Sequence, residues 1–309
     1  MKVHWFVLGS AVLLSSIGTA QASYDYITLA DPADNGYTVA EDINNAGQVV
    51  GFYNDAGGTQ HGFLFFSGSY TPLDAPGAVA TQANGINAAG QITGYSTDGG
   101  GATSGFVLSG GTYSPFSIPA SAGTFGWGIN SAGTVSGYYD DAGGTAHGFV
   151  ASTPINDPAS PGSTVVYGIN NAGQAVGYYT DAGGVAHSFI ESGGSFTPLD
   201  DPNGANGTFA TGINNVGQVV GYFLDGSGAL YGFVESGGTY ATLSDPDGLP
   251  GTTQAFGIND QGEVVGSFID SSNGEVRGFE ATLAVPEPAS LALLGLGLAG
   301  LARARRRSI

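Results

Sequence analysis

The stretch GINNAGQAVGYYTDAGGVAHSF, from Gly168 to Phe189, decides the fold because the chain repeats its pattern six times. The copies can be counted by the Asn of each Ile-Asn pair, and these residues are spaced 43, 43, 40, 44 and 45 positions apart. The six residues are Asn44, Asn87, Asn130, Asn170, Asn214 and Asn259. A period of this length is typical of four-stranded propeller blades. The sequence therefore predicts a repeat protein.

Glycine dominates the positions that are identical in all copies. In the fourth copy, Gly173 follows the Asn by three residues, and Gly177 comes four residues later. Each copy then has a Gly-rich turn and closes on a Phe, which is Phe189 in the fourth copy. Positions that every copy shares are those that the fold needs, so we expect a functional site where the copies differ.

Turn residues divide the fourth copy into four strands. Its β-branched and aromatic residues predict strands over 164–170, 174–179, 187–192 and 195–199. The segments between them are rich in Asn, Asp and Gly, which bond nearby backbone or accept a positive φ in turns. Each copy is thus expected to be an antiparallel meander with apolar residues on both faces, which needs neighbours on both sides.

The count of fourth strands favours a closed ring. Copies one to five have a fourth strand, but in copy six residues 279–283 run directly into Val285. Residues 24–29, followed by Asp-Pro, have the pattern of the missing strand. We therefore predict an all-β fold, a six-bladed β-propeller of four-stranded blades whose last blade is closed by the N-terminal strand. An open β-repeat array is the alternative.

Composition and charge limit the function. The chain has 309 residues, 55 of them Gly and none Cys, yet 41% are hydrophobic and 32 are Tyr or Phe, enough for a core. The absence of cysteine from the sequence excludes disulfides and thiolate zinc sites. Between residues 23 and 284, Arg277 is the single Lys or Arg against 24 acidic residues, which gives a formal charge of −23. Nucleic acid and anionic membrane surfaces are therefore not expected as partners.

The first 22 residues have the pattern of a signal peptide. Lys2 precedes a long apolar run, and Ala20 and Ala22 form a small-x-small cleavage site for signal peptidase. The order of charge, apolar run and cleavage site predicts export.

The C-terminal segment 285–309 has three parts in a fixed order. A Pro-Glu-Pro motif is followed by an apolar stretch over 289–302 and then by a cluster of arginines. The residues of the motif and the cluster are Pro286, Glu287, Pro288, Arg303, Arg305, Arg306 and Arg307. The segment resembles the PEP-CTERM sorting signal of Gram-negative bacteria, which an exosortase recognises. The resemblance implies transient membrane anchoring through the C-terminal span, an inner-membrane intermediate, removal of the tail, and transfer to the cell surface or extracellular matrix.

A plain C-terminal anchor, oriented by its arginines, is the alternative for this segment. It differs only in whether the tail is later removed. The domains that we expect are a signal peptide at 1–22, a six-repeat propeller domain at 23–284 and a sorting signal at 285–309.

The repeats also resemble a family of bacterial secreted proteins. The pattern GINxxGxVVGYY, seen at 212–222, and a later His-Gly-Phe, seen at 147–149, are similar to HAF-type extracellular repeats. The resemblance covers 23–284. It implies an extracellular repeat protein and implies no particular reaction or ligand. The residues that depart from the pattern are Ser104, Tyr231 and Arg277 in place of His, and Asp42 in place of Gly.

The residue before each Gly-Ile-Asn varies between copies. It is Asn84, Trp127, Tyr167, Thr211 or Phe256, with Glu41 in the first copy. A position that varies among repeating neighbours is expected to face a surface or a channel, where aromatic rings can stack on sugars. Packing between blades is the alternative.

The candidate ligand-binding residues combine this position with the departures from the repeat. They are Trp127, Tyr167, Phe256, Glu41, Asp42 and Arg277. We include the last three because the first and sixth copies are neighbours in a closed ring, so that these charged side chains are expected to converge.

The histidines and turn aspartates predict no cofactor and no metal site. His61, His147 and His187 occupy one repeat position on separate copies, which favours a structural role at a strand edge. Turn chemistry accounts for Asp55, Asp141, Asp181 and Asp225, although weak Ca²⁺ binding stays open.

No catalytic residues are predicted. The pairs Glu41-Asp42, Asp140-Asp141 and Asp200-Asp201 suggest a glycosidase, but neighbouring residues of a strand point in opposite directions. The sequence has no nucleophile elbow, phosphate loop or metalloprotease motif. We therefore expect a non-enzymatic surface or matrix interaction module whose candidate ligand is extracellular polysaccharide. The alternative is an extracellular hydrolase of glycan or lipid with its site on one end of the ring.

Overall fold

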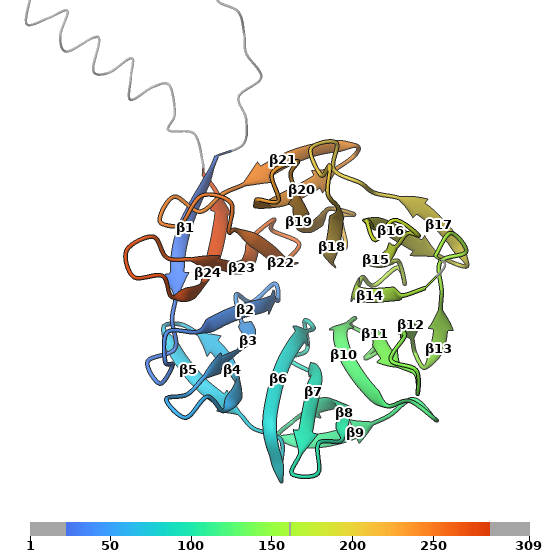
Figure 1. Cartoon of the computed structure of the whole chain (residues 1–309). Coiled ribbons are helices and arrows are strands. Elements are labelled where there is room, and N and C mark those ends of the chain that lie inside the picture. The colour runs from blue at the N-terminus through green and yellow to red at the C-terminus, as the bar shows by residue number, and fades with distance from the viewer. Residues whose placement is uncertain (1–22, 161, 285–309) are drawn as a thin grey trace, which may run out of the picture.

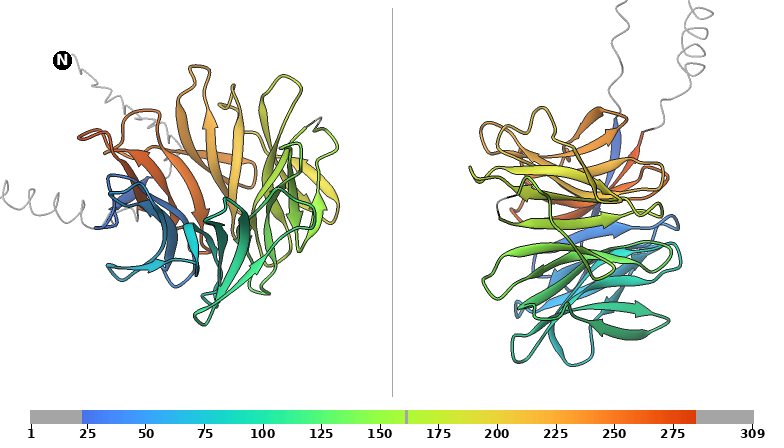
Figure 2. Two further views of the ribbon diagram at one scale, coloured as in Figure 1. Left: turned by 60° about the horizontal axis from the view of Figure 1, so that its bottom comes forward. Right: turned by 90° about the vertical axis from the view of Figure 1, so that its right-hand side faces the viewer.

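Strands from six consecutive repeats follow one another around a central axis (Figure 1). The computed structural model describes residues 23–160 and 162–284, and within these ranges the secondary structure consists of strands and turns without a helix. The prediction of an all-β, propeller-like ring is confirmed. Seen from its side, the ring consists of twisted sheets that succeed one another as layers (Figure 2).

Each repeat contributes strands at four distances from the axis. The innermost strands are β2 (Thr38–Ile43), β6 (Ala78–Ile86), β10 (Gly123–Ile129), β14 (Thr164–Ile169), β18 (Thr208–Ile213) and β22 (Gln254–Ile258). The second strands are β3 (Val49–Asn54), β7 (Ile92–Asp98), β11 (Val135–Asp140), β15 (Ala175–Thr180), β19 (Val219–Leu224) and β23 (Val264–Ile269). The third strands are β4 (Gln60–Phe66), β8 (Thr103–Ser109), β12 (Ala146–Val150), β16 (Ala186–Ser192), β20 (Leu230–Ser236) and β24 (Val276–Leu283). The outer strands are β5 (Ser69–Leu73), β9 (Thr112–Phe116), β13 (Thr153–Ile155), β17 (Ser195–Pro198), β21 (Thr239–Leu243) and β1 (Tyr24–Leu29).

Hydrogen bonding divides these strands into five sheets, so the prediction of six separate blades is met only in part. Four sheets have four strands each, and the second and third repeats share a sheet of eight strands. One parallel pair, Gly123 with Thr103, joins β10 to β8. Within the shared sheet, the strands of each repeat keep their own antiparallel order.

The N-terminal strand closes the ring, as predicted. β1 pairs with β24 in antiparallel register, from Tyr24 opposite Leu283 to Leu29 opposite Gly278. The backbone N–H of Ala284 donates to the carbonyl of Ser23 at 2.8 Å. On the other side of this sheet, β2 packs against β22, β23 and β24. The first and sixth repeats are thus in contact, which excludes the open array (Figure 1).

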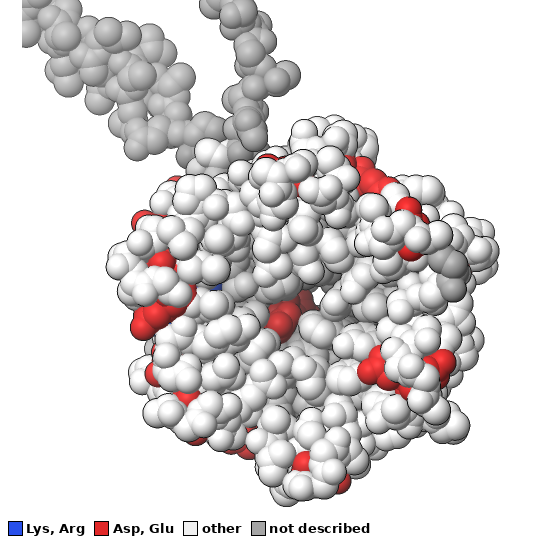
Figure 3. All heavy atoms as spheres, viewed as in Figure 1, with Lys and Arg blue, Asp and Glu red and all other residues white. Residues whose placement is uncertain are grey.

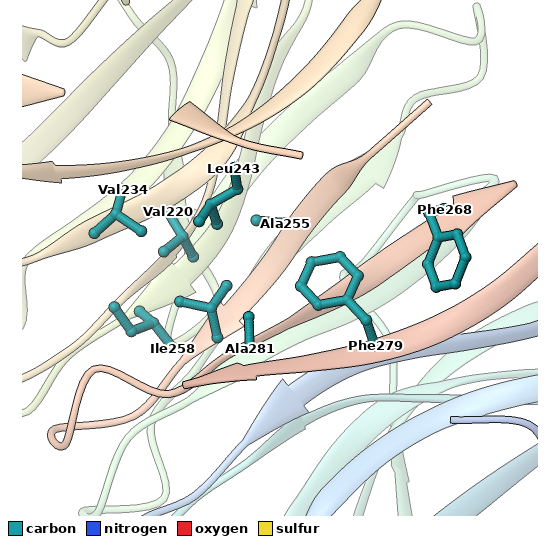
Figure 4. Packing of buried hydrophobic residues seen from close by; sticks show 9 residues of the cluster. Val220, Val234, Leu243, Ala255, Ile258, Phe268, Phe279 and Ala281 are labelled. Carbon is teal, nitrogen blue, oxygen red and sulfur yellow. The ribbon is translucent and has the colours of Figure 1, made fainter. Parts of the chain in front are cut away.

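The core consists of apolar side chains held between adjacent sheets. Figure 4 shows one such cluster, in which Val220 and Leu243 of the fifth repeat lie near Ala255 and Phe279 of the sixth. The Phe that closes each repeat is at most 1% exposed. These residues are Phe63, Phe106, Phe149, Phe189, Phe233 and Phe279. Their burial explains why this Phe is identical in all copies.

Several predictions from the sequence fall on residues that the structure does not describe. They concern the signal peptide, with Ala20 and Ala22, and the sorting signal, with its Pro-Glu-Pro motif and arginines at 303–307. Over 23–160 and 162–284, no helix has the length and hydropathy needed to cross a membrane.

Candidate functional site

Each innermost strand carries a β-bulge, and the bulged residue is the one that varies between copies. In β18, for example, the pairing with β19 passes from Ala210 to Gly212 and leaves out Thr211. The residues left out at this position are Glu41, Asn84, Trp127, Thr211 and Phe256, with Tyr167 and Gly168 left out together in β14; β6 has a further irregularity at Val79. A bulge bends the strand and changes the direction of a side chain. The variable residues therefore leave the regular alternation of the sheet.

The glycine after the bulge allows neighbouring repeats to approach. A Cβ at Gly212 would lie 2.6 Å from the carbonyl oxygen of Phe256 in the next repeat. Asp42 occupies this position in the first repeat and uses its side chain instead. Its Oδ2 accepts a hydrogen bond of 2.9 Å from the backbone N–H of Ile86, in the next repeat, and its Oδ1 accepts one of 2.9 Å from Ile43.

Three cavities follow one another along the ring axis and form a central channel. The first, of about 190 Å³, is lined by Glu41, Trp127, Tyr167, Thr211, Tyr222, Gln254 and Phe256, and we call it the aromatic mouth. The second, of about 50 Å³, shares four of these residues and adds Asp42 and Asn84. The third, of about 130 Å³, shares Asp42 with the second and reaches the repeat asparagines. Figure 3 shows a hollow at the centre of the ring with acidic atoms in it.

Aromatic side chains both line the mouth and pack against their neighbours. The rings of Trp127 and Tyr167 meet edge to face, with centroids 4.6 Å apart. Those of Tyr222 and Phe256 do so at 6.2 Å. Trp127, Tyr167 and Phe256 are each partly buried. The two predictions for these residues, packing between blades and facing a channel, therefore apply together.

Glu41 and Asp42 both line the channel, although they are neighbours in sequence. Glu41 lines the aromatic mouth, and Asp42 lines the second and third cavities. The bulge at Glu41 interrupts the regular alternation of β2 on which the prediction of opposite directions rested. Burial, together with the charge of Asp42, raises the pKa of Glu41 to about 8. Burial also raises the pKa of Asp42 to about 7, against the lowering effect of its hydrogen bonds from Ile86 and Ile43.

Arg277 does not join this pair, so the predicted convergence of the three charged residues is wrong. Its guanidinium forms an ion pair with Asp34 at 2.9 Å and a second ion pair with Glu275. The first and sixth repeats are neighbours, as expected. However, Arg277 belongs to the third strand from the axis, β24, whereas Glu41 and Asp42 belong to the innermost strand, β2.

Two buried polar atoms of the channel lining have no hydrogen-bond partner within the described residues. They are the indole Nε1 of Trp127 and the Oδ1 of Asn84. Asn84 is only 4% exposed, and its Nδ2 donates to the carbonyl of Gly126 at 2.9 Å. Buried polar groups are nearly always paired with protein or water. The donor and the acceptor are therefore enclosed by the channel lining without a partner among the described residues.

The repeat asparagines form a belt at the far end of the channel, a feature that the sequence analysis missed. Each Asn donates its Nδ2 to the backbone carbonyl of the Asn in the next repeat, at 2.9 to 3.3 Å, and Asn259 donates back to Asn44 at 3.2 Å. Each Oδ1 accepts hydrogen bonds from the backbone of its own turn, as the sequence predicted. The identity of this Asn in all copies was the available signal, but its partner lies about 43 residues away.

The histidines lie on third strands and each has its own partners. His61 bonds Asp74 at 2.9 Å, and His187 bonds Asp200 at 2.8 Å. Burial lowers the pKa of His61, but the hydrogen bonds and charges of Asp74 and Asp55 outweigh it and raise the pKa above its ordinary value. The described residues contain no group of three or more His, Asp or Glu that could hold a metal ion.

A comparison with protein families identifies the end of the chain. Residues 284–307 match the PEP-CTERM protein-sorting motif. The chain carries a PEP-CTERM sorting motif. Such a motif implies export, processing by an exosortase and sorting to the surface of a Gram-negative bacterium. A search of curated proteins finds no match.

Solved structures resemble the ring of this PEP-CTERM protein. A lectin of Aleuria aurantia, determined with Fucα1-6GlcNAc, has a TM-score of 0.52 at 16% identity and covers 82% of this chain and 96% of its own. The SapL1 lectin, determined with α-methyl fucoside, has a TM-score of 0.52 at 12% identity, with 83% and 99% covered. TolB of Acinetobacter baumannii has a TM-score of 0.52 at 11% identity, with 82% and 66% covered. At such identities the likeness concerns the fold alone.

Proposed function

We propose that this PEP-CTERM protein is an exported, non-enzymatic β-propeller that binds polysaccharide through its aromatic mouth. Counting the eight-stranded sheet as two blades gives six blades, one for each repeat. Signal peptidase and an exosortase would process the chain at its two ends, by way of an inner-membrane intermediate. The propeller would then act at the cell surface or in the extracellular matrix.

One observation carries the proposal: five of the six residues that vary between repeats line one cavity. Three of them, Trp127, Tyr167 and Phe256, present aromatic surface there, and aromatic rings pack well on the apolar faces of sugars. The carboxyl group of Glu41 and the amide of Gln254 supply polar groups beside them. Cavities with apolar walls and a few convergent polar groups are the usual form of small-molecule sites. The lectins of similar fold were determined with fucosides, so sugars are the first class of ligand to test.

The test is glycan-array binding by the purified chain, beside the double variant Trp127→Ala, Tyr167→Ala. We expect selective binding that the double variant loses by about tenfold or more, since stacking contributes about 0.5–1.5 kcal/mol per ring. Phe66→Ala is the matched control because Phe66 is 45% exposed and outside the cavity lining. Far-ultraviolet circular dichroism establishes whether each variant keeps its strands. Equal binding by a folded double variant would contradict the proposal.

The second candidate is a hydrolase of extracellular glycan or lipid that uses the same end of the ring. The observation in its favour is the pair Glu41 and Asp42, whose pKa values are both raised. A carboxyl group that stays protonated near pH 7 can act as a general acid. Incubation of the bound glycan with the chain distinguishes the two functions, because only a hydrolase releases shorter products. The Glu41→Gln variant of such a hydrolase should release none.

We further propose that the domain works without a resident cofactor. The turn aspartates, such as Asp141, use Oδ1 to accept backbone hydrogen bonds from their own turns. Weak Ca²⁺ binding at these turns is tested by running the array with calcium and with a chelator. Unchanged binding under both conditions is the expected result.

A further inference from the structure

The carboxyl groups of Glu41 and Asp42 have no cationic partner from their own domain. Arg277 is the one Lys or Arg in residues 23–284, and it pairs with Asp34 and Glu275. Glu41 is only 7% exposed, so its carboxylate is removed from most of the water that would otherwise stabilise its charge. A buried carboxylate without a counter-ion either takes up a proton or binds a cation from outside.

Aromatic side chains surround the space next to Glu41. Trp127 from β10, Tyr167 from β14 and Phe256 from β22 line the aromatic mouth together with Glu41. Tyr222, from the second strand β19, completes the wall. The electron-rich faces of such rings attract ammonium groups, most strongly where water is excluded. Carboxylate and aromatic walls in one cavity therefore favour the same kind of ligand.

The unpaired polar atoms suit the rest of an amino sugar. Both atoms are covered in the structure, so a small movement of the lining would expose the Nε1 of Trp127 to a hydroxyl oxygen and the Oδ1 of Asn84 to a hydroxyl or amino group. Trp127 lines both the mouth and the second cavity, and Asn84 lines the second. Both groups therefore lie along one path from the mouth into the channel.

From these observations we propose that the aromatic mouth recognises an ammonium group, carried by an amino sugar of a polysaccharide with free amino groups. The inference rests on the proposed function, and it specifies the ligand class of the same site. The formal charge of −23 over residues 23–284 would also attract a cationic polymer to the domain. Glu41 is the charge partner of the ammonium group, and Trp127, Tyr167 and Phe256 form its cage.

Binding of a cation is then linked to the ionisation of Glu41. Because an ammonium ion stabilises the carboxylate, affinity increases as the pH rises from 5 toward 8, since the ionised fraction of free Glu41 grows as the pH approaches its pKa of about 8. The other titratable groups near Glu41 are Asp42, Tyr37, Tyr95, Tyr167 and Tyr222. Burial raises the pKa of each of these tyrosines, so they stay neutral in this range. Asp42, whose pKa burial raises to about 7, also loses its proton as the pH rises, so its charge changes in the same sense as that of Glu41.

The experiment uses the full chain in detergent and two matched pairs of probes. Calorimetry compares a glucosamine tetramer with an N-acetylglucosamine tetramer, and choline with its neutral isostere 3,3-dimethylbutan-1-ol. We expect the cationic member of each pair to bind at least about tenfold more tightly. Glu41→Gln should abolish this preference, whereas Asp25→Asn, which removes an exposed carboxylate of β1, should keep it. Choline does not titrate, so its affinity between pH 5 and pH 8 reports on the protein alone.

The outcomes separate this inference from the proposed function. Equal or tighter binding of the acetylated tetramer would overturn the ammonium inference and leave carbohydrate binding in place. Choline binding that depends on Glu41, without binding of either tetramer, would support the ammonium cage and contradict the polysaccharide proposal. Absence of binding by all four probes to the folded chain would overturn the inference. A preference for cations that Glu41→Gln retains would also overturn it.

Discussion

Gly212 lies where the innermost strand of one repeat meets that of the next. A Cβ at this position would lie 2.6 Å from the carbonyl oxygen of Phe256 and 3.0 Å from a methyl group of Val220. We expect Gly212→Ala to lower the free energy of unfolding by about 1–3 kcal/mol, because rigid backbone must move to admit the methyl group. Urea unfolding measures the change. Gly226→Ala is the control, since a Cβ there meets nothing within 4 Å. A loss of the same size in both variants would show that the close approach is not the cause.

β1 is the element that connects the two ends of the ring domain. It pairs along all six of its residues with β24, and Leu29, at 2% exposure, belongs to the core between the sixth and first repeats. Deletion of residues 24–29 would expose the edge of β24, and unpaired edges associate with other chains. We expect the deletion to lower stability by more than about 3 kcal/mol and to cause self-association, measured by thermal unfolding and light scattering.

A circular permutant is the control for this deletion. Because Ser23 and Ala284 are hydrogen-bonded neighbours, a short turn can join them, with new ends opened in the loop over 200–207. β1 then follows β24 as a hairpin, and the permutant should be monomeric with nearly the stability of the original chain. An aggregating permutant would indicate that chain order, rather than the paired edge, maintains the ring.

Over the whole molecule, the shifted pKa values predict how stability changes with pH. Glu41 and Asp42 have raised pKa values in the folded chain. Their contribution to the free energy of unfolding is therefore largest below about pH 4, where both are protonated even in the unfolded chain. That contribution is lost as the pH rises through about 7 and 8. His61 and His187 also have raised pKa values, and their contribution is likewise lost on the alkaline side. The melting temperature should therefore fall between pH 5 and pH 9.

The turn aspartates act in the opposite direction at acid pH. Backbone hydrogen bonds, above all those from Thr59 and Thr145, lower the pKa values of Asp55 and Asp141, so their contribution is present above about pH 4 and lost below it. Stability should thus be highest near pH 5. Glu41→Gln should raise it by about 1–4 kcal/mol at pH 9 and change it little at pH 5, as measured by calorimetric unfolding. Asp25→Asn, with the same change in net charge, should show no such dependence on pH.

The sequence by itself determined the repeat, the four strands of each copy and the closure of the ring. These features depend on local signals: turns of Asn, Asp and Gly, alternating apolar residues, and a spare strand at residues 24–29 whose partner is missing at 279–283. The sorting motif at 284–307 is equally local, because short linear patterns are recognised without a fold. Repetition alone also marked the variable position before each Gly-Ile-Asn, from which Glu41, Trp127, Tyr167 and Phe256 were included in the candidate site.

Only the tertiary structure decided what these residues can do together. The bulge at Glu41 depends on pairing between β2 and β3, so the sequence could not reveal that Glu41 and Asp42 both line the channel. Arg277 belongs to β24, the third strand from the axis, and this position separates it from Glu41 and Asp42 on the innermost strand β2. The asparagine belt likewise joins residues about 43 positions apart. In a closed ring, residues distant in sequence meet at the axis, and the geometry of the bulges determines which side chains are directed there.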